Sequence, residues 1–363
     1  MHRRPERYRA VRGGRGARSP AHTTNQNRTP GIRQTMSSRR ITLALGGGGA
    51  RGVAHLGVAQ TLIDAGYVID RIVGISIGSL AGAMLAFEPD IQKTQSRAVQ
   101  FLMSPSFRRH QELMFGAAQP TADEGGGLFN WYDKIKHYLR GNRLMYRVAT
   151  RPGLLPALIL QDVTERLLPE ADIRDARIPL SIVAIDLRSG QRVILNSGPL
   201  RPAVQGSSAI PGIFPPVEYD GMELCDVGVL CSVPAVEARG LSDSVVVAVE
   251  VATRITPIRG CSTALDVLMR VDEVGEVLFR RYVRAAADIV IRPDVDHIPW
   301  FDFTRPQSLI DAGRRAATRV LRQLDDLFRR RERGLQPRGR TRTAESESGA
   351  TEPASRADTE TAL

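Results

Sequence analysis

Two short glycine-containing segments carry the residue types of acyl-transfer chemistry. The first is Gly46-Gly-Gly-Gly-Ala-Arg-Gly52, and its glycines leave backbone N–H groups open to an anionic group at a helix N-terminus. The second is Gly74-Ile-Ser-Ile-Gly78, in which Ser76 has a glycine two residues away on either side, the pattern of a nucleophile elbow. A serine beside a row of free N–H groups is typical of a nucleophile next to an oxyanion hole.

The glycine run by itself also fits a second chemistry. Gly47-x-Gly49-x-x-Gly52 matches a dinucleotide-binding fingerprint, and Asp70 stands where a ribose-binding acid is expected. On the glycines alone, an oxyanion hole and a nucleotide loop are equally good interpretations. The serine elbow favours acyl transfer, because a dinucleotide site gives the segment 74–78 no role.

A serine nucleophile needs a base, and the six histidines offer poor candidates. His55 lies in the helix predicted after the glycine run, where a packing or capping role is expected. His297 is late in the chain, but no predicted strand leads into it. Asp226 is the better candidate, because it follows a predicted hairpin over 217–224 and begins a turn. An isolated aspartate in a turn is ordinarily a turn former, so Asp226 needs further support.

The elements around these segments place them together. Strand-like runs cover 41–45 and 71–75, with helical patterns over 53–65 and from Ser79 onward. Each motif then lies at the carboxyl end of a strand, and the two strands are neighbours in a parallel sheet. Further strands are predicted at 180–185, 191–195, 243–251 and 288–292, and further helices at 264–287 and 307–330.

This alternation predicts an α/β fold with a mostly parallel central sheet and helices on both faces. The segment of about 104–169 has no strand pattern and reads as a helical insertion. It carries aromatic and aliphatic side chains that suit a lid or acyl channel, although ordinary packing explains most of them. The folded domain is expected over 41–330.

Three blocks in this order resemble the patatin-like phospholipases. They are Gly-Gly-Gly-Ala-Arg-Gly (47–52), Gly-Ile-Ser-Ile-Gly (74–78), and Asp-x-Gly (226–228) preceded by Ser-Ser-Ala-Ile-Pro-Gly-Ile-Phe-Pro-Pro-Val (207–217). The resemblance extends over about 41–330 and implies a three-layer α/β/α fold. It also implies hydrolysis of lipid acyl esters by a Ser–Asp dyad, with no metal and no cofactor.

The resemblance assigns roles to individual residues. Ser76 would be the nucleophile between Gly74 and Gly78, and Asp226 would be the base. The glycine loop would form the oxyanion hole, and Arg51 within it would be a supporting cation. The residues of this loop are Gly47, Gly48, Gly49, Ala50, Arg51 and Gly52.

One position departs from the family pattern. The residue after the base is Val227, followed by Gly228, where the family has a glycine in the first of these two places. A β-branched side chain resists positive φ. Either the loop follows a different path here or the dyad is displaced and catalysis is impaired.

Charge and cysteine content set the expected surroundings. The net charge is +11, but residues 1–40 hold eleven arginines and one acid, which leaves only +1 for the other residues. A nucleic-acid partner is therefore not expected, whereas the tail suits peripheral contact with an anionic membrane. Three cysteines and the lack of a signal-peptide pattern favour a cytoplasmic protein.

The two ends of the chain have the composition of disordered tails. Residues 1–40 and 331–363 contain few large apolar side chains, and Met36 is an alternative start just before the first predicted strand. The leading hypothesis for the part between them is a serine lipid acyl hydrolase, with a lipid or acyl ester as substrate. The alternatives are a dinucleotide-binding protein and a patatin-like module that binds lipid or protein without catalysis.

Overall fold

The computed structural model describes residues 39–115, 150–228, 232–252, 255–258, 260–262 and 264–334. The two predicted tails lie almost wholly outside these residues, as does the part of the predicted insertion from 116 to 149. The domain boundaries at 41 and 330 remain predictions, although the first described strand begins at Arg40 and the last described helix ends at Glu332.

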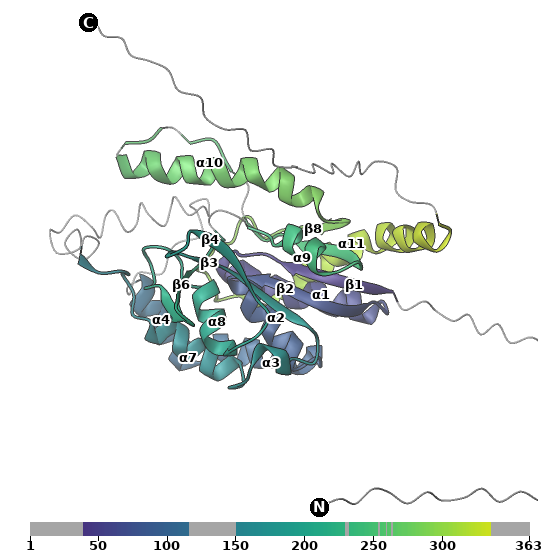
Figure 1. Ribbon diagram of the computed structural model, residues 1–363, viewed down its shortest axis with the longest axis horizontal. Coiled ribbons are helices and arrows are strands. Elements are labelled where there is room, and N and C mark those ends of the chain that lie inside the picture. The colour runs from purple at the N-terminus through teal and green to yellow at the C-terminus, as the bar shows by residue number, and fades with distance from the viewer. Residues whose placement is uncertain are drawn as a thin grey trace, which may run out of the picture. The chain divides into compact units, whose positions relative to one another are not determined.

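The described residues form one eight-stranded sheet (Figure 1). Its strand order is β5-β6-β3-β2-β1-β7-β8, and β4 also pairs with β3. Five neighbouring strands are parallel. The strands on the β4, β5 and β6 side are antiparallel, so the sheet is mixed but mostly parallel, as predicted. The strands are β1 Arg40–Leu45, β2 Val68–Ile75, β3 Leu180–Asp186, β4 Gln191–Leu195, β5 Val217–Tyr219, β6 Met222–Cys225, β7 Val245–Val249 and β8 Ile289–Ile291.

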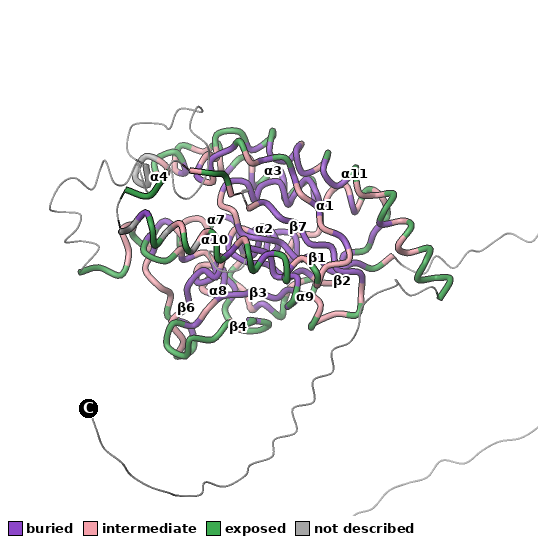
Figure 2. Tube along the Cα trace, turned by 90° about the horizontal axis from the view of Figure 1, so that it is seen from above, coloured by how far each residue is buried: buried purple, intermediate pink, exposed green. Residues whose placement is uncertain are grey.

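Helices cover both faces of this sheet, and alternate residues of the strands face one side or the other. Leu43 and Leu45 belong to the larger apolar core together with α1, α2, α3 and α11, whereas Ala44 belongs to a second core with α9 and Val283. The helices are α1 Ala54–Asp64, α2 Ile77–Phe87, α3 Ile91–Leu102, α4 Pro105–Phe115, α7 Leu158–Leu167, α8 Leu200–Ser207, α9 Ala235–Leu241, α10 Ala264–Ala285 and α11 Pro306–Glu332. Figure 2 shows the central strands buried between helices whose outer sides are exposed.

The central strands are buried on both faces, as expected of a covered parallel sheet. Every residue of β7 is buried, and so are five of the six residues of β1. In the register of the sheet, Leu45 of β1 lies opposite Gly74 of β2 and Val249 of β7. The glycine run after β1 and the serine after β2 therefore leave the sheet side by side.

The sequence interpretation differs from the structure in a few elements. The helix expected from Ser79 begins at Ile77, directly after Ser76, and a short 3-10 helix over Gly49–Val53 precedes α1. Helices α3, α8 and α9 were not predicted, because small and polar residues interrupt their apolar patterns. Within the expected insertion, the described residues form the helices α4 and α7.

Candidate active site

Ser76 occupies a strained turn between β2 and α2. Its φ is 54° and its ψ is −128°, a backbone conformation that a residue with a side chain adopts at a cost of about 1–3 kcal/mol. The flanking glycines permit this turn through close backbone contacts. A Cβ atom on Gly78 would lie 2.2 Å from the carbonyl oxygen of Leu45, and one on Gly74 would lie 2.6 Å from the carbonyl oxygen of Gly78. The expected elbow is therefore present.

A buried hydroxyl that the sequence interpretation did not single out holds this turn. The Oγ of Ser207, on α8, accepts a hydrogen bond of 2.9 Å from the N–H of Ser76. The same Oγ donates to the carbonyl of Val183 on β3 over 2.7 Å. Ser207 thus ties the strained residue to the neighbouring strand. The sequence signal was its place at the start of the 207–217 block, but nothing in the pattern revealed its partner.

Asp226 lies directly beside the serine. The Ser76 side chain lies close enough to its carboxylate to favour the ionised form, and the carboxylate accepts a hydrogen bond of 2.6 Å from the N–H of Gly228. The backbone N–H of Asp226 donates to the carbonyl of Ala209 over 2.9 Å, which fixes the residue at the end of β6. Burial raises the pKa of the Asp226 carboxyl to about 6, and the interactions with Ser76 and Gly228 partly oppose this rise.

Val227 is accommodated without a positive φ. Among the described non-glycine residues only Ser76 and Asp220 have a positive φ, so Val227 does not adopt the conformation that its side chain resists. Its side chain is buried in the second apolar core, beside Val73 and Ile75. A Cβ atom on Gly228 would lie 2.9 Å from Oδ1 of Asp226, so a side chain at this position would displace the carboxylate.

The glycine run lies against the serine, since a Cβ atom on Gly47 would come within 3.3 Å of the Cβ of Ser76. Its N–H groups are not equivalent. The N–H of Gly47 donates to the carbonyl of Ser232 over 2.9 Å, and the N–H of Ala50 donates to the carbonyl of Trp300 over 2.5 Å. Within the described part of the chain, Gly48 and Gly49 have no such backbone acceptor. These two are therefore the available donors.

Arg51 and His55 support the loop from behind. Nε of Arg51 donates to the carbonyl of Ile298 over 2.6 Å, and burial lowers the pKa of this guanidinium to about 10, against the attraction of Asp296. Nε2 of His55 donates to the carbonyl of Gly46 over 2.8 Å. Burial lowers the pKa of His55 to about 4, which keeps the ring neutral. Arg51 thus contacts the loop over 294–301, and His55 has the packing role that was expected.

Two residues considered from the sequence lie elsewhere. His297 is exposed in the loop between β8 and α11, and no contact in the described structure joins it to Ser76. Asp70 lies in the amino-terminal half of β2, away from the glycine run, where it binds the hydroxyl groups of Thr42 and Ser244. The structure therefore does not bring the expected ribose-binding acid to the glycines.

An apolar cavity opens beside Ser76. It runs between α2, α3 and α7, and most of its wall is aliphatic or aromatic, including Leu80, Met84, Phe101, Phe107, Leu167 and Phe303. Gly49 and Ser76 line it as well, so the glycine run and the serine border the same space. Ile159 and Leu160 of the expected insertion also line the cavity, whereas Leu158 is exposed. The aromatic residues of the insertion between 128 and 146 lie outside the described residues.

Within the described residues, no group of three or more His, Cys, Asp or Glu side chains is arranged to hold a metal ion. Nor does any helix of the described chain have both the length and the apolar composition needed to cross a bilayer.

The sequence matches known proteins over most of its described part. Residues 43–239, more than half of the chain, match the profile of the patatin-like phospholipases. An uncharacterized NTE family protein of Mycobacterium tuberculosis is 27% identical over 332 residues, which cover 85% of this chain and 51% of that protein. The mouse patatin-like phospholipase domain-containing protein 6 is 27% identical over 225 residues, or 61% of this chain and 14% of that protein.

These relatives are longer proteins. This chain spans about half the length of the mycobacterial protein and a smaller part of the mouse protein. Among solved structures, VipD of Legionella pneumophila is similar with a TM-score of 0.43 at 17% identity, over 80% of this chain and 67% of VipD. The human GIVD cytosolic phospholipase A2, solved with methyl gamma-linolenyl fluorophosphonate, gives a TM-score of 0.34 at 11% identity, over 81% of this chain and 60% of that chain.

Proposed function

Because the chain belongs to the patatin-like phospholipase family, we propose that it is a serine hydrolase that cleaves the acyl esters of lipids. Ser76 is the nucleophile and Asp226 the base of a dyad without histidine. The observation that carries the proposal is the position of the Ser76 side chain beside the buried Asp226 carboxylate, at the wall of an apolar cavity. A polar reactive pair beside an apolar channel suits a substrate with a reactive ester and a long hydrocarbon chain.

In the first half of the reaction, Oγ of Ser76 attacks the ester carbonyl carbon while Asp226 takes the serine proton. The negative charge that develops on the carbonyl oxygen is stabilised by the N–H groups of Gly48 and Gly49, which have no described backbone acceptor. The tetrahedral intermediate then collapses. Its bond to the leaving alcohol breaks, the alcohol receives the proton from Asp226, and an acyl-serine remains.

In the second half, a water molecule attacks the acyl-serine and Asp226 takes the water proton. The bond between the acyl carbon and Oγ breaks, Ser76 recovers its proton from Asp226, and a carboxylic acid leaves. The Asp226 side chain can accept a proton only when it is ionised, which requires a pKa below the working pH. Its strength as a base, however, increases with its pKa. A pKa of about 6 for Asp226 combines ionisation near neutral pH with greater basicity than an ordinary aspartate has.

The apolar cavity would hold the acyl chain. Its residues come from the same side of the sheet as α1, α2 and α3, and its walls place only a few polar side chains, such as Thr164, Gln205 and Ser208, among apolar ones. A chain bound there leaves its ester next to Ser76.

Peripheral contact of residues 1–40 with an anionic membrane remains a proposal. Sedimentation with anionic vesicles tests it, by comparing the protein with and without residues 1–35.

Substitution of the dyad tests the proposal. We expect Ser76→Ala to lower the rate of hydrolysis of p-nitrophenyl butyrate and of phosphatidylcholine by at least about a thousandfold, because the covalent step is lost. The matched control is Ser96→Ala, which removes a hydroxyl from an exposed position on α3 and should leave both rates unchanged. Turnover by Ser76→Ala close to that of the unaltered protein would refute the assignment. Folding of each variant is checked by circular dichroism.

A further inference from the structure

Helix α10 turns an apolar face away from the protein. Leu268, Phe279 and Tyr282 are 68%, 62% and 77% exposed, and Val271 and Leu278 are exposed to a similar extent. In a helix of 3.6 residues per turn these positions, with Val267 and Val274, form one continuous stripe. No residue in the described part of the chain covers this stripe.

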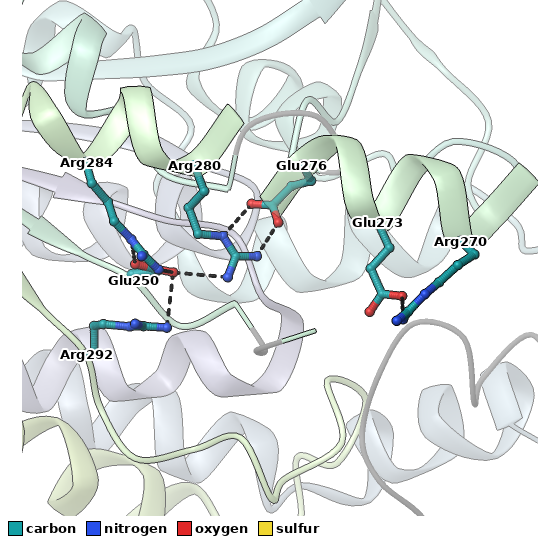
Figure 3. A network of polar contacts seen from close by, with 7 residues as sticks. All are labelled: Glu250, Arg270, Glu273, Glu276, Arg280, Arg284 and Arg292. Carbon is teal, nitrogen blue, oxygen red and sulfur yellow. Dashed lines mark hydrogen bonds and ion pairs between the residues drawn. The ribbon is translucent and has the colours of Figure 1, made fainter. Parts of the chain in front are cut away.

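The opposite, polar face of α10 binds the body of the protein. Figure 3 shows Arg280 and Arg284 of this face reaching toward the buried carboxylate of Glu250, just after β7, with Arg292 approaching from the other side. Arg284 donates to Glu250 over 2.6 and 2.8 Å, and Arg280 also pairs with Glu276. Ion pairs of buried groups thus fix the orientation of α10, so the outward direction of the apolar stripe follows from contacts within the protein.

The stripe is large for a surface that stays in water. Seven apolar side chains with these exposures offer on the order of 700 Å² on each chain, close to the roughly 800 Å² that each partner buries in a stable protein complex. Such a patch exceeds what most monomers leave exposed. The area therefore indicates a covered surface in the functional protein.

The order of residues along the stripe shows what covers it. Gly275 lies at its centre, and no atom lies within 4 Å of the place where its Cβ would stand. Val271 and Phe279 are four residues before and after Gly275, and Leu268 and Tyr282 are seven before and after it. If two copies of α10 crossed antiparallel at Gly275, Val271 of each copy would therefore meet Phe279 of the other. Leu268 of each copy would likewise meet Tyr282 of the other. A helix-interior glycine is unfavourable by about 1 kcal/mol relative to alanine, and close approach of a second helix at that point gives it a role.

From this arrangement we propose that a second copy of this chain covers the stripe, in a twofold dimer whose α10 helices cross antiparallel at Gly275. A self-complementary pattern of this kind is what an isologous interface requires. The dimer does not depend on the proposed hydrolase function.

Two observations favour a second copy over a lipid surface. Helix α10 has four acidic and four basic residues, so it has no net charge to attract anionic lipids. It also packs, through Val283, against the core on the α9 side of the sheet, whereas the cavity beside Ser76 belongs to the α2 and α3 side. A membrane bound at α10 would face away from the cavity.

The oligomeric state tests the proposal. Sedimentation velocity of the full chain at micromolar concentrations should give a species of twice the chain mass. Phe279→Glu should raise the dimer dissociation constant at least tenfold, and Leu268→Glu combined with it should give a monomer. Leu187→Glu is the matched control, because Leu187 is an exposed leucine in the turn after β3, and it should leave the dimer intact. The exposed positions of these residues make unfolding of the variants unexpected, and circular dichroism checks it.

Cross-linking tests the crossing point. In a background with Cys261→Ser, Gly275→Cys should form a covalent dimer on mild oxidation, because position 275 meets itself across the axis. Val271→Cys alone should not, whereas a mixture of Val271→Cys and Phe279→Cys chains should cross-link to each other. The proposal would be overturned if the protein were a monomer at all concentrations, or if Phe279→Glu left the dimer unchanged. It would also be overturned if Phe279→Glu abolished binding to vesicles and not dimerisation.

Discussion

At the scale of single residues, the candidate site combines a strained serine with a buried acid. The positive φ of Ser76 directs its side chain out of the turn toward Asp226, and hydrogen bonds to Ser207 and Ser79 hold the residue in that conformation. Asp226 has been moved out of water, and its carboxylate is stabilised by only a hydroxyl and one backbone N–H. Both residues are therefore unfavourable for stability, and both are arranged for reaction.

Asp226→Asn tests the energetic side of this arrangement. The folded pKa of about 6 is above the ordinary value of 3.8, so the folded state binds this proton more tightly than the unfolded chain does. The stability from this group is fully present below about pH 4 and is lost as the pH rises through about 6. Asp226→Asn should therefore increase the free energy of unfolding at pH 8 by on the order of 2 kcal/mol, with no increase at pH 4. Urea unfolding at the two pH values measures the difference, and a loss of stability at pH 8 would contradict it.

The same carboxyl sets the pH dependence of the reaction. Since only ionised Asp226 accepts the serine proton, kcat/KM for a soluble ester should fall as the pH falls through about 6. The fall should be about tenfold per pH unit on the acid side. Activity that stayed constant down to pH 4 would rule out Asp226 as the base.

Ser207 gives a prediction that separates positioning from packing. Ser207→Ala leaves the N–H of Ser76 and the carbonyl of Val183 without their partner, and we expect kcat to fall about tenfold to a hundredfold with little change in KM. The matched control is Ser181→Ala, another fully buried hydroxyl, whose partners are Asn196 and Arg71. It should lower stability without lowering kcat. Equal kcat losses in the two variants would mean that Ser207 acts only through stability.

Motif spacing singled out Ser76 and the glycine run, because both lie in local turns, whereas Asp226 was assigned only through the family resemblance. The roles of Ser207 and Arg51 were not predictable in the same way. Their hydrogen bonds join residues 131 and 247 positions apart in the chain, and only the assembled sheet brings such partners together. Whether Val227 is tolerated also depended on tertiary structure, since the adjacent core receives its side chain.

At the scale of elements, the parallel strands position Ser76 and the glycine run, and the helices form the apolar cavity beside them. Short apolar runs predicted β1, β2, β3 and β7, although β2 begins at Val68, three residues before its predicted start. Helices α3 and α8 were missed, although both line the cavity, because their sequences are polar on average and their apolar faces are narrow. The sequence thus predicted the strands that precede Ser76 and the glycine run better than the helices that line the apolar cavity.

Filling the cavity should separate long substrates from short ones. Ala81 of α2 is buried in the cavity wall, so Ala81→Phe would place a ring in the space proposed for the acyl chain. We expect hydrolysis of p-nitrophenyl palmitate to fall at least tenfold, whereas hydrolysis of the acetate should change by less than about threefold. Val68→Phe, at an exposed position on β2, is the control. Equal effects on both esters would show that the acyl chain does not occupy this cavity.

At the scale of the whole molecule, the two faces of the sheet have different surroundings. The α2 and α3 side contains the reactive serine and the cavity, while the α9 side supports α10 and its outward apolar stripe. The amphipathic pattern of α10 was visible in the sequence, but not its orientation. That orientation is set by the buried pairing of Glu250 with Arg280, Arg284 and Arg292, three residues that a local pattern cannot connect to Glu250.

The most direct test of the account is covalent labelling of Ser76 by a fluorophosphonate probe. The probe phosphonylates only a serine whose hydroxyl is activated and whose oxyanion hole is in place. We expect peptide mapping to find the adduct on Ser76 and Ser76→Ala to abolish labelling. Asp226→Asn should slow labelling by at least about a hundredfold, while Ser96→Ala should label like the unaltered protein. A folded protein that fails to label, or that labels on another serine, would contradict the assignment of Ser76 and Asp226 as the reactive pair.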